Sequence, residues 1–162
     1  MAINEEFAMS IVSTIANYLQ IPKVDVTFVK LNNEYKEVAG YYIPGSNVIC
    51  INSGAINNFN DLEFTALLIH EMRHAYQDFQ IRNKNMSNEP KDLLAIWDEE
   101  MKNYKHPIHH NGDFIKQKIE IDAIAFTYFF LKKYLKQDLI IPNDIHEEVI
   151  KRVGKIEKTK NM

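Results

Sequence analysis

The segment from residue 70 to residue 74 reads His-Glu-Met-Arg-His and holds the residues best suited to chemistry. His70 and His74 are four positions apart, so on a helix they differ by about 40° in direction and can reach one ion. Neutral imidazole nitrogens are good zinc ligands, and a catalytic zinc keeps three protein ligands and a water. Glu71 lies about 100° around such a helix from His70, where a carboxylate can accept a proton from that water. The spacing predicts a zinc site with His70 and His74 as ligands and Glu71 as general base.

The third ligand has to come from another part of the chain. Glu120 is the preferred residue because it stands early in an apolar helical stretch, where the small Ala123 allows a neighbouring helix to approach closely. Asp122 of the same stretch is an alternative, and a histidine is the other common solution. The histidines in question lie in the preceding loop and are His106, His109 and His110. The residues by themselves leave these options open.

Two further features concern catalysis. A zinc site that hydrolysed an amide bond would need a donor for the oxyanion of the tetrahedral intermediate, and a tyrosine hydroxyl can supply it. Tyr76, Tyr104 and Tyr128 are candidates, and the sequence does not choose among them. Arg73 places a charge between the two histidines, and we expect it to pair with Asp78 or Asp122 or to reach solvent.

Hydrophobic periodicity predicts the elements that position these residues. Residues 1–20 have apolar side chains at helical spacing, and Pro22 ends that helix. Residues 23–30 alternate between apolar and polar, as a strand does. Residues 38–44 and 47–52 are two more strand-like runs, and the turn residues between them predict a hairpin.

The rest of the chain is helical in pattern. We expect a helix over residues 62–81, capped by Asn60 or Asp61, then helices over 91–104 and 114–135 and a last one opened by Pro142 and Asn143. On the first of these, an apolar back face opposes the histidines and consists of Phe64, Leu68, Met72, Ala75 and Phe79. The prediction is an α+β fold in one domain over residues 1–162: an N-terminal helix, a three-stranded antiparallel or mixed sheet, and four helices.

Composition narrows the class of protein. The chain has 162 residues and a net charge of −3, which does not favour nucleic acid or an anionic membrane as partner. No stretch has the pattern of a secretion signal or a membrane span. Cys50 is the single cysteine, and we expect it to be a buried apolar residue in a reducing compartment. These features together predict a cytoplasmic protein.

The stretch AGYYIPGSNVICINSGAINNFNDLEFTALLIHEMRHAYQ resembles the ImmA/IrrE-type metallopeptidases, which are small gluzincins (minigluzincins). Their hairpin precedes a Phe-Thr…His-Glu-x-x-His helix, and Phe64 and Thr65 occupy the corresponding place here. EIDAIAFTYFFL is similar to the helix that carries that group's metal-binding glutamate, which would be Glu120. The likeness covers residues 39–131. It departs at Ile124, where the group has an Asp or Asn that supports the site.

The resemblance implies a zincin-like fold with an edge strand beside the active-site helix, to which an extended peptide could add. It also implies a Zn²⁺ cofactor and a peptide or protein substrate, in that family often a particular regulatory protein. The alternative is a catalytically silent zincin-like domain that binds a protein, which Arg73 and Ile124 favour. The sequence does not distinguish a peptidase from a metallohydrolase that acts on a non-peptide amide or ester. It also does not give the oligomeric state.

Overall fold

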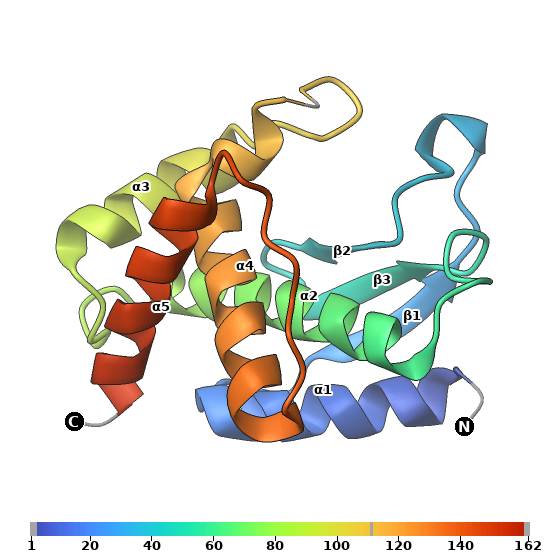
Figure 1. Ribbon diagram of the computed structural model, residues 1–162, viewed down its shortest axis with the longest axis horizontal. Helices are drawn as coiled ribbons and strands as arrows, with labels where there is room; N and C mark the ends of the chain where they lie inside the picture. Colours follow the sequence, from blue (N-terminus) through green and yellow to red (C-terminus); the bar gives the residue numbers. More distant parts are fainter. Residues whose placement is uncertain (1–2, 111, 161–162) are drawn as a thin grey trace. The chain divides into compact units, whose positions relative to one another are not determined.

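The computed structural model describes residues 3–110 and 112–160. The chain forms two compact units, Met1–Phe79 and Gln80–Met162. The first contains helix α1, the three strands and most of helix α2, and the second contains helices α3, α4 and α5 (Figure 1). The α+β prediction is confirmed, and the prediction that residues 1–162 act as a single domain remains a prediction.

The sheet consists of β1 (Asp25–Val29), β2 (Gly40–Ile43) and β3 (Val48–Asn52), in the order β1-β3-β2. β2 and β3 pair in antiparallel fashion, which confirms the predicted hairpin, and β1 runs parallel to β3. The hairpin turn contains Gly45 at φ 81° and Asn47 at φ 56°, a left-handed conformation that these two residue types tolerate best. The sheet is therefore mixed.

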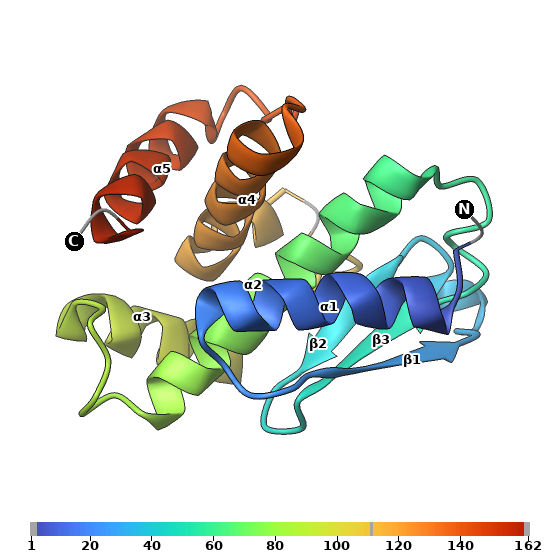
Figure 2. The same ribbon diagram turned by 90° about the horizontal axis from the view of Figure 1, so that it is seen from below.

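Helices α1 (Glu5–Leu19) and α2 (Asp61–Arg82) lie on the apolar face of the sheet. The ring of Phe64 on α2 lies 6.0 Å from that of Phe7 on α1 and 6.3 Å from that of Phe28 on β1. A Cβ at Gly40 of β2 would lie 3.5 Å from the Leu67 side chain of α2, so this helix packs directly on the strand. Figure 2 shows α1 beside the strands. This packing gives α2 a fixed place over the sheet.

Helix α2 begins with a reciprocal cap. The side chain of Asn60 accepts the backbone N–H of Glu63, and the Glu63 carboxylate accepts the backbone N–H of Asn60. This capping box satisfies two amide groups that a helix start leaves unpaired. Of the two predicted caps, Asn60 is the correct one.

The predicted back face of α2 is also present. Four of its five residues are buried, and Phe79 is half-buried. At the far end of the helix, the buried carboxylate of Asp78 accepts the hydroxyl of Tyr42 at 2.6 Å and the backbone N–H of Gly45 at 2.8 Å. Both apolar packing and hydrogen bonds therefore hold the hairpin and the helix together.

The second unit contains α3 (Lys91–Lys102), α4 (Lys118–Phe130) and α5 (His146–Lys160). α4 and α5 run side by side in both views (Figures 1 and 2). Between them, the Arg152 Nε donates to Asp122 at 2.7 Å, and its guanidinium lies over the ring of Trp97 of α3. Arg152 also lies 3.5 Å from Glu89. A buried charge network therefore ties the helices of this unit together.

The predicted helix over residues 114–135 is wrong at its start, whereas its predicted end at Leu135 is correct. Residues 114–116 form a short 3-10 turn, and Gln117 is extended, so that α4 starts only at Lys118. The reason is tertiary: Glu100 of α3 accepts the first two N–H groups of the helix, those of Lys118 and Ile119. After Phe130 the last turn widens into a π-helix over residues 131–135.

The last helix also starts later than predicted. Residues after Pro142 first form a turn, and α5 begins at His146. Over the described ranges 3–110 and 112–160, none of the helices combines the length and the apolar character that crossing a membrane requires.

Candidate metal centre

His70 and His74 face the same way from successive turns of α2. Their Nε2 atoms lie 3.2 Å apart, and the ring planes cross at 81° with the centroids 4.9 Å apart. Both rings are half-buried. Phe64 of the back face packs against Phe7 of α1 and Phe28 of β1, which anchors the helix that carries the two imidazoles.

Gln77 fixes the orientation of the second histidine. Its side-chain oxygen lies 2.8 Å from Nδ1 of His74, and Gln77 is fully buried. An amide oxygen only accepts hydrogen bonds, so this contact favours the tautomer with the proton on Nδ1, in which Nε2 is left to bind a metal. This is the tautomer that a metal-binding Nε2 needs.

Glu120 lies in the first turn of α4 and is 2% exposed. The hydroxyl of Tyr104 donates to its Oε1 at 2.5 Å. A buried carboxyl group without a hydrogen-bond partner would be costly, so the hydroxyl of Tyr104 stabilises Glu120 in its buried position.

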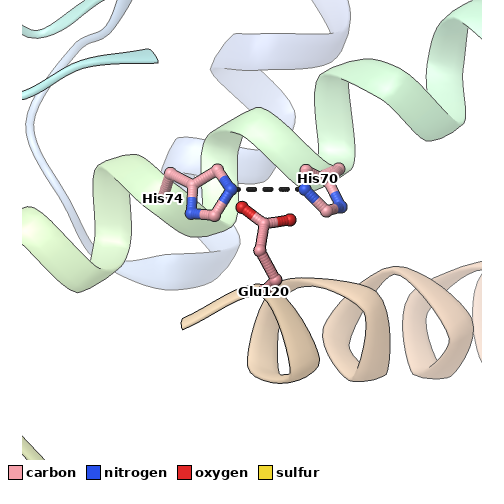
Figure 3. Close-up of side chains that lie close together, drawn as sticks. All are labelled: His70, His74 and Glu120. Atoms are coloured by element: carbon pink, nitrogen blue, oxygen red, sulfur yellow. Dashed lines mark hydrogen bonds between the residues drawn. The ribbon is translucent and has the colours of Figure 1, made fainter. Parts of the chain in front are cut away.

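The three side chains come together. One ligand atom from each of His70, His74 and Glu120 lies within 4.8 Å of the other two (Figure 3). In the close-up the carboxylate points toward the two imidazoles. The donor set fits zinc: two Zn–N bonds of 2.0–2.1 Å at a tetrahedral angle put the nitrogens about 3.3 Å apart, close to the distance between the two Nε2 atoms. The structure thus contains a candidate metal site of two histidines and one glutamate.

Glu71 occupies the position next to the first histidine on α2 and is 7% exposed. It is not one of the three clustered residues. Its location on the helix is the one from which the sequence predicts a general base, and that role remains a prediction.

The alternative third ligands lie elsewhere. The carboxylate of Asp122 is engaged by Arg152, and the candidate cluster in the described part of the chain contains neither Asp122 nor a loop histidine. Of the loop histidines, His106 packs edge-on to the ring of Tyr104 at 6.4 Å. Burial, and secondarily the nearby His109, lower the pKa of His106.

The remaining side chains named from the sequence have other surroundings. Arg73 does not reach solvent, because it is 4% exposed and its guanidinium lies 4.1 Å from the centroid of the Tyr76 ring. This corrects one of the expectations for Arg73. Tyr128 accepts a hydrogen bond from Lys132 at the surface. Tyr104, another of the candidate tyrosines, is hydrogen-bonded to Glu120 of the cluster.

Sequence reasoning missed two contacts. Gln77 stands three positions after His74, a spacing that brings side chains together on a helix, and this signal could have been used. The bond from Tyr104 to Glu120 had no such signal, because the two residues belong to different elements.

Comparison with known proteins adds no relative. No protein-family model matches the chain, and neither a curated protein nor a solved structure gives a significant match. The geometry of this site and the likeness of its motifs are therefore the observations that bear on function.

Proposed function

We propose that this protein is a zinc metallopeptidase that hydrolyses peptide bonds. The observation that carries the proposal is the approach of His70, His74 and Glu120 to within 4.8 Å of one another. Two imidazoles at helical spacing and a carboxylate from another helix are the ligand set of catalytic zinc sites, which keep a fourth position for water. The resemblance of both helices to the ImmA/IrrE-type motifs supports the same assignment.

In the proposed reaction, each side chain has a separate task. Zinc held by the three ligands would polarise the scissile carbonyl and lower the pKa of its water to about 7. Glu71 accepts the proton of the attacking water and delivers it to the leaving amide nitrogen. Gln77 keeps His74 in the tautomer that leaves Nε2 for the metal. A peptide or protein is the proposed substrate, and the lone Cys50 favours the cytoplasm as the compartment.

Metal content tests the ligands. The purified protein is dialysed with zinc and then freed of excess metal, and the bound zinc is counted by mass spectrometry. We expect about one zinc per wild-type chain. His70→Ala, His74→Ala and Glu120→Ala should each reduce that content strongly. If His70→Ala leaves the zinc content unchanged, the site assignment is wrong.

Glu71→Gln tests catalysis separately from metal binding. The substitution keeps size and removes the base, so we expect full zinc content and loss of cleavage of a fluorogenic peptide mixture by at least about 100-fold. The rival function is the catalytically silent protein-binding module. If zinc-loaded wild-type protein and Glu71→Gln are equally without cleavage while zinc stays bound, the rival replaces the peptidase proposal.

A further inference from the structure

The side chain of Gln117 joins the residue before α4 to the segment that follows α3. Gln117, directly before the helix, accepts the backbone N–H of Lys105 at 3.0 Å through Oε1 and donates to the carbonyl of the same residue at 3.2 Å. Its Nε2 also donates to the carbonyl of Phe114 at 2.8 Å. The side chain is 8% exposed and binds the neighbouring segment at both polar groups of one residue. The segment after α3 is therefore held in a fixed position beside the residue that precedes α4.

The same residue caps the helix that carries Glu120. The backbone carbonyl of Gln117 accepts the N–H groups of Glu120 at 3.1 Å and Ile121 at 2.9 Å. Glu100 of α3 accepts the N–H groups of the two preceding residues, Lys118 and Ile119, each at 2.9 Å. The first turn of α4 thus has partners for its amides from both its own cap and the preceding helix.

These contacts bring Tyr104 and Glu120 together. Tyr104 precedes the residue that Gln117 holds, and Glu120 is three residues after Gln117, so one side chain fixes the backbone on both sides of the Tyr104–Glu120 hydrogen bond. At 2.5 Å the bond lies at the short end of the range for a hydroxyl donating to a carboxylate. Its donor is on Oε1, so this oxygen has a partner before any metal binds.

We propose that Tyr104 is a positioning residue that makes Glu120 a one-oxygen metal ligand, with Gln117 holding Tyr104 in place. The inference rests on the proposed function, because it concerns the same metal. A carboxylate can ligate a metal with one oxygen or with both, and a donor fixed on one oxygen favours ligation through the other. One-oxygen ligation keeps the site four-coordinate with its water, which is the arrangement of a catalytic zinc. Tyr104 is thereby assigned to the metal ligand rather than to the oxyanion.

The test compares Tyr104→Phe with wild type and with Tyr128→Phe. Tyr128 is on α4, the helix of Glu120, but its hydroxyl accepts a hydrogen bond from Lys132 at the surface, which makes it a matched control. Zinc affinity is measured by competition with a chromogenic chelator. We expect a fall of roughly 10- to 100-fold for Tyr104→Phe, the usual effect of losing a hydrogen-bond partner of a ligand, and no change for Tyr128→Phe.

A second measurement reads the coordination itself. The three proteins are loaded with cobalt(II), whose visible d–d bands weaken when four-coordinate geometry gives way to five-coordinate geometry. We expect weaker bands in Tyr104→Phe and wild-type bands in Tyr128→Phe. A purely packing role for Tyr104 would lower the stability of the metal-free protein without changing this spectrum.

The outcomes are separable. Equal zinc affinity and equal cobalt spectra for wild type and Tyr104→Phe would overturn the inference and leave the proposed function standing. Unchanged affinity with reduced peptide cleavage would assign Tyr104 to the oxyanion and also overturn it. A wild-type protein that binds neither zinc nor cobalt would overturn the proposed function, and this inference with it.

Discussion

Gln77 lies fully buried beside the metal site and directs its side-chain oxygen at one ring nitrogen of His74. Replacing it with leucine keeps the volume and removes the acceptor. The His74 ring can then rotate or change tautomer, and zinc affinity should fall by roughly 10- to 100-fold. Chelator competition on Gln77→Leu measures the change.

The matched control for this prediction is Gln80→Leu. Gln80 is the next glutamine of α2, and six residues place it about 240° around the helix from His74. Gln80→Leu should therefore bind zinc as wild type does. If Gln77→Leu also matches wild type, the hydrogen bond to His74 has no role in metal binding.

His106 provides a prediction about pH. Burial is the main cause that lowers its pKa below the ordinary value of about 6.5, and His109 adds to the effect. The unfolded chain therefore takes up this proton more readily than the folded protein, and the resulting loss of stability sets in as the pH falls below about 6.5. His109→Ala should raise the pKa of His106 part of the way back, since burial persists. NMR titration of the ring protons follows it, and an unchanged midpoint would contradict the prediction.

At the residue scale, the sequence predicts contacts between residues of one helix better than contacts between residues that are far apart along the chain. The pair His70 and His74 was predictable because one helix fixes both, and the position of Glu71 follows from the same geometry. Glu120 was preferred from the residues around it, and the structure places it with the histidines. The Tyr104 contact depends on a non-helical segment held by Gln117, and no periodicity encodes such a contact.

At the scale of elements, helix ends that are set by neighbouring residues in the sequence were predicted well. Ends that are set by contacts with another helix were not. α2 was predicted to within one residue because its apolar period is regular and Asn60 caps it locally. The start of α4 was predicted wrongly because Glu100 of another helix sets it, and the π geometry of residues 131–135 was not predicted although their helical end was. The hairpin was predictable from its turn residues, whereas the parallel pairing of β1 with β3 joins segments separated along the chain and had no local signal.

Helix α4 carries two buried carboxylates with different tasks. Asp122 is 1% exposed and hydrogen-bonded to Arg152 of α5, so Asp122→Ala would remove the shorter of the two carboxylate contacts of a largely buried guanidinium. We expect a loss of about 3 kcal/mol in the free energy of unfolding, measured with urea on metal-free protein. Zinc affinity should stay unchanged, because Asp122 is outside the metal cluster.

Asp98→Ala is the control for this prediction. Asp98 pairs with Lys102 on the surface of α3 at 3.1 Å, and its side chain is 41% exposed. Exposed pairs of this kind contribute at most about 0.5 kcal/mol, so the variant should unfold at nearly the wild-type urea concentration. A loss of zinc binding in Asp122→Ala under conditions where it is folded would reassign the third ligand.

At the scale of the whole molecule, each compact unit has aromatic side chains in its core. Phe64 is fully buried in the first unit, and Trp97 and Phe126 are buried in the second. Burial of one such ring stabilises a fold by about 2–3 kcal/mol. Each unit therefore contains apolar packing that does not depend on metal, and we expect the metal-free chain to be folded.

Zinc should nevertheless raise the stability of the folded chain. His70 and His74 are far from Glu120 along the chain, so the unfolded chain does not hold the three groups within reach of one ion. A ligand that binds only the folded state stabilises it by about 4 kcal/mol at 1,000 times its dissociation constant. For a chain of this length, that corresponds to a rise in Tm of roughly 10 °C. Circular dichroism melts with zinc and with EDTA measure the difference. The double variant His70→Ala/His74→Ala should melt at the same temperature in both, and a zinc-dependent rise in that variant would place the bound metal somewhere other than at these imidazoles.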